Sequence, residues 1–75
     1  LRQSDKAIKS FDEALLIDQR NVEAWTHRGN SYRKLGKFEE AMESYDKALA
    51  VSDDFLQAWY QKGVTLSKMN RIEEA

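Results

Sequence analysis

The sequence contains no cysteine and no proline, and it has only one histidine and three glycines among its 75 residues. Without cysteine there can be no disulfide, no thiolate nucleophile and no cysteine-based zinc site. A single histidine also excludes a metal site that takes several histidines from one chain. No apolar run approaches the roughly 20 residues that span a membrane, and no signal or transit segment is visible. We therefore expect no metal, no cofactor and no membrane contact.

An excess of charge of one sign is also lacking. Twelve lysines and arginines are interspersed with 13 aspartates and glutamates, which leaves a formal net charge of −1. Such a balance produces no strong field toward nucleic acid or anionic lipid, so we do not expect a nucleic-acid partner. The length allows one small domain, and the chain opens at Leu1 instead of methionine. We expect a piece of a longer protein, located in the cytoplasm.

What the chain does contain is an internal repeat. When the sequence is shifted by 34 residues against itself, Trp25 aligns with Trp59 and Gly29 aligns with Gly63. Seven of 20 positions are identical between residues 22–41 and 56–75, and five of 15 are identical between 7–21 and 41–55. Self-similarity at one offset along the whole chain indicates a protein built from repeated units.

The sequence of each 34-residue unit predicts two helices. Apolar residues recur every three to four positions in 23–35 and in 38–51, the spacing of one helix face. Residues 5–17 repeat the second of these patterns and residues 56–69 repeat the first. No segment alternates with a period of two. The sequence therefore predicts an all-α stack of antiparallel helix pairs, a short α-α superhelix of about two repeats in one domain. Its parts are the second helix of a first unit in 1–21, a complete unit in 22–55, and the first helix and the start of the second helix of a third unit in 56–75.

Caps are predicted from single residues between these patterns. Gly36 can adopt the left-handed conformation that ends a helix, and Asn70 holds the matching place one period later. Asn21 and Asp54 precede helical patterns and suit the N-cap position. The sequence therefore predicts helix ends near Gly36 and Asn70, with helix starts after Asn21 and Asp54.

Two glycines instead lie inside predicted helices. Gly29 and Gly63 occupy the same phase, although glycine costs about 1 kcal/mol relative to alanine in a helix interior. Because this unfavourable residue recurs at the same position of the repeat, we infer that a neighbouring helix approaches closely there. We expect Ala41 and Ala7 to be the small partners that allow this approach.

A 34-residue pair of helices with this order of tryptophan, glycine, tyrosine and alanine resembles the tetratricopeptide repeat. The local sequence is similar to that of prokaryotic members of this family. The resemblance covers essentially the whole chain and implies a solenoid that binds other proteins. The residues that match the packing positions of the repeat are Ala7, Phe11 and Ala14 in the first unit, Trp25, Gly29, Tyr32, Ala41, Tyr45 and Ala48 in the complete unit, and Trp59, Gly63 and Leu66 in the third.

The chain departs from this family at the joints between units. The family usually has a proline after its second helix, which would fix the direction of the chain and end the helix. Residues 18–21 and 52–55 occupy these joints without a proline. The hypothesis is that the joints are compliant, and that the helices on either side could even fuse into one.

The stretch AWTHRG places Trp25, His27 and Arg28 beside a glycine, which could be a small active site. Catalysis would need a nucleophile or partner at a fixed spacing, and none is present. We interpret Trp25 and Trp59 as core residues and His27 as a surface residue. The Arg28 side chain, like that of Lys62, would lie along the edge of a groove.

Other charged groups have equally simple interpretations. Glu39 and Glu40 are neighbours in a helix, so they point about 100° apart and do not converge on one substrate. Asp53 and Asp54 resemble a cap more than a calcium loop, which needs six or more oxygen ligands. We therefore predict that the chain has no catalytic residue and is not an enzyme. Glu73 and Glu74 are expected in a first helical turn, and the basic cluster Arg33, Lys34 and Lys37 on a solvated face.

A stack of such pairs presents its first helices on a concave face, which is a common binding surface. We expect a peptide or a helix of another protein to bind there. Asn30 matches an asparagine that family members use to clamp a C-terminal carboxylate, but Thr26 replaces the lysine of that clamp, so the clamp is not carried over. The residues predicted to face this groove are Glu23, Thr26, Asn30, Arg33, Lys34, Gln57, Tyr60, Val64, Ser67 and Lys68.

The alternative function is self-assembly. The half-units at either end of the chain would complete each other between copies, by stacking or by exchanging helices. The first function predicts a protein or peptide partner, and the second predicts a homo-oligomer formed through the open ends.

Overall fold

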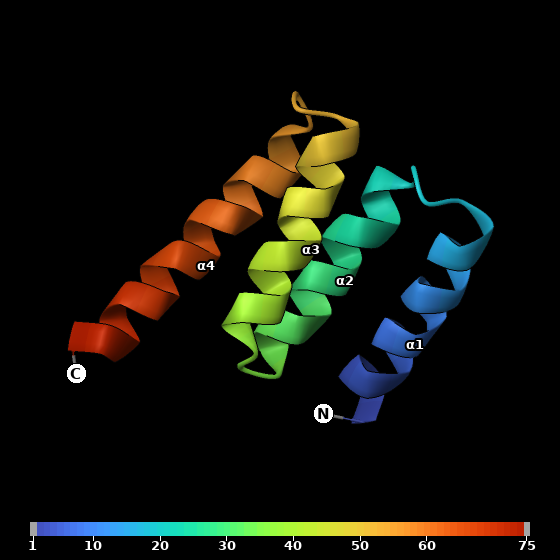
Figure 1. Ribbon diagram of the computed structural model, residues 1–75. Coiled ribbons are helices and arrows are strands. Elements are labelled where there is room, and N and C mark those ends of the chain that lie inside the picture. The colour runs from blue at the N-terminus through green and yellow to red at the C-terminus, as the bar shows by residue number, and fades with distance from the viewer. Residues whose placement is uncertain (1, 75) are drawn as a thin grey trace.

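The computed structural model describes the backbone of residues 2–74 and the side chains of residues 3–71. The described residues form four α-helices and no strand, which confirms the predicted all-α helical repeat. Consecutive helices run in opposite directions and are joined by short turns (Figure 1). The helices are α1 (Arg2–Ile17), α2 (Val22–Lys34), α3 (Phe38–Val51) and α4 (Leu56–Glu74).

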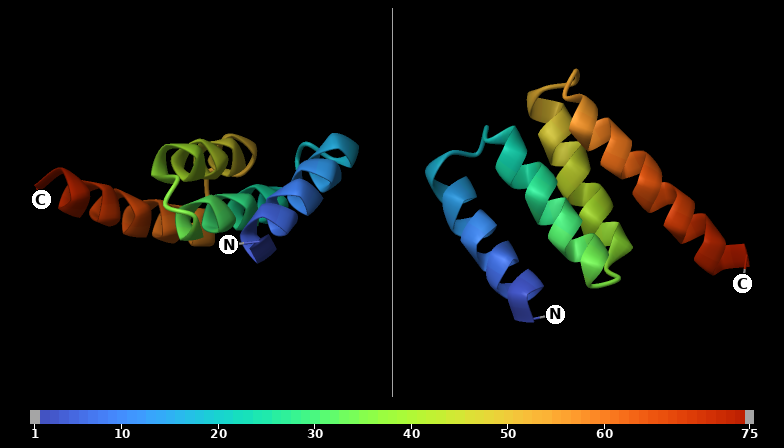
Figure 2. Two further views of the ribbon diagram at one scale, coloured as in Figure 1. Left: turned by 90° about the horizontal axis from the view of Figure 1, so that it is seen from below. Right: turned by 180° about the vertical axis from the view of Figure 1, so that it is seen from behind.

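Helix α2 is at the centre of the packing. It contacts α1, α3 and α4, whereas α4 contacts only α3 and α2 among the described elements. α1 and α4 lie at opposite edges of the body, and α3 is stacked over α2 and α4 (Figure 2). The molecule measures 40 × 31 × 14 Å, so it is a thin slab of helices. A slab this thin leaves the helices at its edges with one side open.

The joint between α1 and α2 is a defined turn. The carboxylate of Asp18 accepts the Arg20 N–H at 3.0 Å, and the side chain of Asn21 accepts the Ala24 N–H at 3.0 Å. Asn21 is therefore the N-cap of α2, as predicted. Because the chain is turned and then capped here, the hypothesis that helices fuse across residues 18–21 is wrong.

The joint between α3 and α4 is also a turn. α3 ends at Val51 and α4 begins at Leu56. The hydroxyl of Ser52 donates to the carboxylate of Asp54 at 2.7 Å, and the Phe55 N–H donates to the Ser52 carbonyl at 3.2 Å. Asp54 therefore closes the turn. It was predicted to be the N-cap of α4, and this prediction is wrong because the helix begins two residues later, at Leu56. Fusion across residues 52–55 is likewise contradicted.

Each joint is also held by a tryptophan. The indole N–H of Trp25 donates to the carbonyl of Gln19 at 2.9 Å, and that of Trp59 donates to the carbonyl of Asp53 at 2.7 Å. In both cases the acceptor lies six residues before the tryptophan. This bond ties the start of each first helix to the turn before it. It provides a restraint at the place where proline is missing.

Helix α2 ends as its sequence predicts. Gly36 has a φ of +78°, its N–H donates to the Arg33 carbonyl at 2.9 Å, and the Lys37 N–H donates to the Tyr32 carbonyl at 2.9 Å. This pair of bonds is a Schellman motif, in which glycine takes the left-handed position.

The matching stop at Asn70 is not present. α4 continues as one helix to Glu74, and no described residue other than glycine has a positive φ. A left-handed conformation costs about 1–2 kcal/mol for a residue with a Cβ atom, so Asn70 stays helical. The predicted break at Asn70 and the start of a second helix after it are wrong. Glu73 and Glu74 fall in the described backbone near the end of α4, not in a first turn.

The core lies where α3 covers α2. Tyr45, Ala41 and Ala48 of α3 have no exposed surface, and a Cβ atom placed on Gly29 would lie 2.5 Å from Cε1 of Tyr45. The predicted close approach at Gly29 is confirmed, and the three heavy atoms nearest to this Cβ position all belong to the Tyr45 ring.

The packing predicted for α4 is not found. A Cβ atom placed on Gly63 would meet no heavy atom within 4 Å among the described residues. Trp59 is 49% exposed and Leu66 is 44% exposed. Gly63, Trp59 and Leu66 were predicted to pack in the core, and this prediction is wrong. The remaining predicted packing residues, Ala7, Phe11, Ala14, Trp25 and Tyr32, are half-buried.

Candidate functional site

A hydrogen-bonded pair lies where α2 meets α3. The phenol of Tyr45 donates to Oδ1 of Asn30 at 2.6 Å. Burial raises the pKa of Tyr45 above its ordinary value of 10.0, and the Thr65 hydroxyl and the charge of Arg33 partly offset this rise. The phenol therefore stays a neutral donor, and it holds the Asn30 oxygen in place. What Asn30 can offer to a ligand is its N–H₂ group, which is a pair of donors.

A second polar contact joins α2 directly to α4. The guanidinium of Arg33 donates to the side-chain oxygen of Gln61. Both side chains are half-buried. The contact crosses from the first helix of one unit to the first helix of the next. It therefore links the two helices that were predicted to form a groove.

The structure places most of the predicted groove residues at the surface, with one exception. Thr26 is 1% exposed, and its hydroxyl donates to the Val22 carbonyl of its own helix at 2.8 Å. Thr26 therefore does not face a groove, which corrects the prediction. Half-buried residues of the set are Asn30, Arg33 and Val64, and exposed residues are Glu23, Lys34, Gln57, Tyr60, Ser67 and Lys68.

The AWTHRG stretch is a packing cluster. Nε of Arg28 pairs with the Asp12 carboxylate at 2.6 Å, and Nη1 donates to the Ser44 hydroxyl at 2.7 Å. The guanidinium also lies over the rings of Trp25 and Tyr32, at 5.5 and 4.9 Å from their centroids. Arg28 thus joins α1, α2 and α3 and is not directed at a substrate.

The histidine of this stretch is exposed, as predicted. Its ring stacks on Phe11 of α1, with the centroids 5.9 Å apart and the planes 22° apart. No group of three or more metal-ligating side chains occurs within the part of the chain that the structure describes. His27 therefore contributes to the contact between α1 and α2.

The Arg28 cluster recurs one period later. Nζ of Lys62 pairs with the Asp46 carboxylate at 2.8 Å and lies 5.4 Å from the centroid of the Trp59 ring. Arg28 and Lys62 were predicted to lie along a groove edge, but their aspartate partners were not predicted. The signal was present, because Asp12 and Asp46 are identical residues one period apart.

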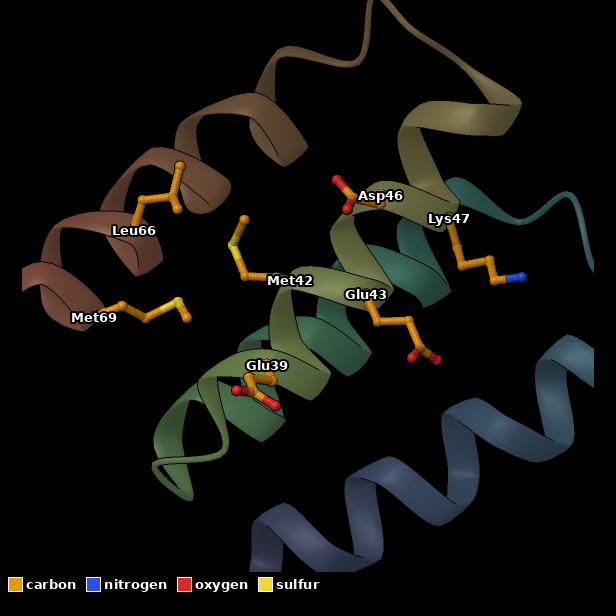
Figure 3. A pocket seen from close by; sticks show the side chains of 7 residues that line it. All are labelled: Glu39, Met42, Glu43, Asp46, Lys47, Leu66 and Met69. Atoms are coloured by element: carbon orange, nitrogen blue, oxygen red, sulfur yellow. The ribbon is translucent and has the colours of Figure 1, made fainter.

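Two hollows lie on either side of α4. One, of about 550 Å³, lies between α3 and α4. In Figure 3, Met42 of α3 and the pair Leu66 and Met69 of α4 point into it, while Glu39 and Asp46 stand at its rim. The other hollow, of about 540 Å³, follows α4 itself and is lined by Trp59, Tyr60, Gly63, Val64, Ser67, Lys68 and Arg71.

Comparison with known protein families agrees with this architecture. The model of the tetratricopeptide repeat matches residues 22–55, and a second model of the same repeat matches residues 56–75. A search among curated proteins finds no matching sequence. Among the described residues, no helix is long and apolar enough to cross a membrane.

The family carries a general function. Tetratricopeptide repeats are generally protein–protein interaction modules, and they typically act as scaffolds without catalytic activity. The four antiparallel helices, the 34-residue period and the two matches over 22–75 agree. The chain belongs to the tetratricopeptide repeat family.

Proposed function

We propose that this chain holds an extended peptide of another protein across the face formed by α2 and α4. The observation that carries this proposal is the orientation of Asn30. Its oxygen accepts the buried Tyr45 phenol, so its amide hydrogens are the groups left for a ligand. A backbone carbonyl of an extended peptide is the natural acceptor for such donors.

The neighbouring side chains define the rest of the ligand. Tyr60 is 69% exposed and offers a large ring that loses little conformational entropy on binding. Lys34 and Lys68 are exposed on α2 and α4 at the same phase of the repeat. The ligand would therefore carry an apolar or aromatic side chain for Tyr60, and acidic groups near the two lysines. The buried Thr26 cannot supply the cation of a C-terminal clamp, so an internal stretch of peptide is favoured.

The test is selection from a displayed library of short peptides, followed by titration of the selected peptides. Tyr60→Ala is the diagnostic variant, because the ring is mostly outside the fold and its removal should leave the helices intact. We expect binding to fall at least about tenfold, which is the usual loss when a central aromatic contact is removed. Lys9→Ala, an exposed change on α1, is the matched control and should bind like the parent chain. Peptides that bind Tyr60→Ala as tightly as the parent chain would rule out this face.

A further inference from the structure

A third hollow, of about 480 Å³, is bounded by α1, α2 and α3. Leu15 and Leu16 of α1 and Trp25 of α2 line its apolar part, and Lys47 of α3 also lines it. The backbones of α1 and α3 do not approach each other closely in the part of the chain that the structure describes. The hollow therefore separates two helices that α2 holds together, and a side chain from outside can enter between them.

Leu16 lies beside this hollow and is 82% exposed. The position one period later is Ala50 of α3. Helix α3 packs against both α2 and α4, and Ala50 is exposed nevertheless. This position of the second helix therefore points away from the helix contacts of the repeat in both units. Leu16 is a large apolar side chain at such an outward position.

The charges that line the hollow are only partly used within the chain. The Asp12 carboxylate, which lines the hollow, pairs with Nε of Arg28 at 2.6 Å. Lys47 is exposed and takes part in neither of the two ion pairs of the described side chains. The hollow thus presents the ammonium group of Lys47 beside an apolar surface. An occupant that fits it brings an apolar side chain with a carboxylate close by.

The outward side of α1 carries this combination. Glu13 precedes Leu16 by three residues, so the two side chains are neighbours on one side of the helix. Lys9 precedes Glu13 by four residues and lies on the same side. All three residues are exposed. A second copy of α1 therefore offers the leucine and the carboxylate that the hollow and Lys47 would accept.

The charges of α1 and α3 are inverted at matching positions. Lys9 and Glu13 of α1 correspond, one period later, to Glu43 and Lys47 of α3. All four are exposed, and none of them belongs to an ion pair of the described side chains. The two helices run in the same direction (Figure 1). If α1 of another copy lay beside α3 at the same height, each lysine would therefore meet a glutamate.

From these observations we propose that two copies of this chain dock through α1, each placing Leu16 in the hollow between α1 and α3 of the other. A twofold axis parallel to α1 brings Lys9 and Glu13 of each copy beside Glu43 and Lys47 of the other. Because both copies use the same surface, the contact is isologous and closes at two copies. The inference does not depend on peptide binding across α2 and α4, and either can hold without the other.

The first test is sedimentation equilibrium of the 75-residue chain over about a hundredfold range of concentration, for the parent and for Leu16→Ala. We expect the mean mass of the parent to rise to that of two copies and no further. Leu16→Ala removes an apolar side chain from both halves of the contact, so association should weaken about tenfold or more. The side chain is mostly outside the fold in the single copy, so this variant should fold like the parent. Ile17→Ala is the matched control, because Ile17 is 89% exposed on the same helix but does not line the hollow, and it should associate like the parent.

A charge swap tests the pairing between the copies. Glu13→Lys places a lysine beside Lys47 of the other copy, and Lys47→Glu places a glutamate beside Glu13. Each change alone should weaken association about threefold or more, because like charges then face each other. The chain with both changes again has opposite charges across the contact and should associate nearly as the parent does. An effect of either change on its own helix would not be reversed in this way.

Several results would overturn the proposal. A parent chain that remains a single copy over the whole range would do so, and so would one that grows beyond two copies. A Leu16→Ala chain that associates as the parent does, or an Ile17→Ala chain that is weakened equally, would place the contact elsewhere. A doubly swapped chain that associates no better than the single variants would contradict the pairing of Glu13 with Lys47.

Discussion

Helices α2 and α4 are two copies of the same element in different surroundings. Each has a tryptophan four residues before an internal glycine, Trp25 before Gly29 and Trp59 before Gly63. In α2 the glycine is pressed against Tyr45, and in α4 it faces open space. The burial of a repeated residue therefore depends on the helix that follows it and not on the residue alone.

The contacts made with preceding residues behave differently, because they recur in both helices. Each tryptophan donates to a carbonyl six residues earlier, and each cation one period apart pairs with an aspartate of the preceding helix. Contacts with the preceding turn and helix are thus repeated along the chain, whereas contacts with the following helix distinguish α2 from α4. This difference can be tested by making the same change in both helices.

The largest contrast is expected at the two glycines. Gly29→Ala would place a methyl group 2.5 Å from Cε1 of Tyr45, and we expect the free energy of unfolding to fall by about 1–3 kcal/mol. Gly63→Ala meets no atom and should raise it by up to about 1 kcal/mol, from helix propensity alone. Urea unfolding at low protein concentration measures both. Equal changes at the two sites would mean that α4 is covered as α2 is.

The bond between Tyr45 and Asn30 should show strong coupling. Asn30→Val leaves the buried phenol without its acceptor and should cost about 1–3 kcal/mol, while Tyr45→Phe should cost about 1 kcal/mol. The double variant replaces both polar partners with apolar groups and should recover a large part of the loss. A double-mutant cycle from unfolding curves should give a coupling of about 1 kcal/mol or more. Additive losses would show that the bond contributes nothing of its own.

The tryptophan bonds should matter about equally in the two helices. Trp25→Phe and Trp59→Phe each remove one N–H donor to a turn carbonyl, and each should lower the free energy of unfolding by about 0.5–1.5 kcal/mol. Trp25 is the more buried of the two, so its loss should be slightly larger. Thermal and urea unfolding would measure the losses. If Trp59→Phe were as stable as the parent, the bond would not restrain the second joint.

The ion pairs should have the smallest effect. Asp12 and Asp46 are about half exposed in their pairs with Arg28 and Lys62. Asp12→Asn and Asp46→Asn should each cost about 0.2–1 kcal/mol, and the cost should shrink as salt screens the charges. The effect at Asp12 should be the larger, because the Arg28 side chain is only 17% exposed. A cost that is unchanged in 1 M salt would contradict an electrostatic origin.

Local features of the fold could be predicted from the sequence. The helices were predictable because apolar residues recur every three to four positions in each 34-residue unit, which places them on one face of a helix. The Asn21 cap and the Gly36 stop were also predictable, since each depends on a side chain or a backbone conformation within a few residues. Asn70 was not, because an asparagine only permits a left-handed turn, and here the helix continues.

Features of the candidate site that depend on neighbouring helices were harder to predict. Thr26 shares the helical stripe of Asn30 and was placed in the groove, yet it is buried. Trp59 and Leu66 were placed in the core by their phase, yet they are 49% and 44% exposed. A helical period assigns residues to a stripe, but it does not say which neighbour faces that stripe.

The contrast between a covered α2 and an open α4 can be measured residue by residue by amide hydrogen exchange, followed by NMR on a dilute sample. The account predicts the slowest exchange in α2 and α3, around Gly29 and Tyr45, and clearly faster exchange around Gly63. It also predicts fast exchange at the turns 18–21 and 52–55. Protection in α4 equal to that in α2 at low concentration, or continuous protection through either turn, would contradict it.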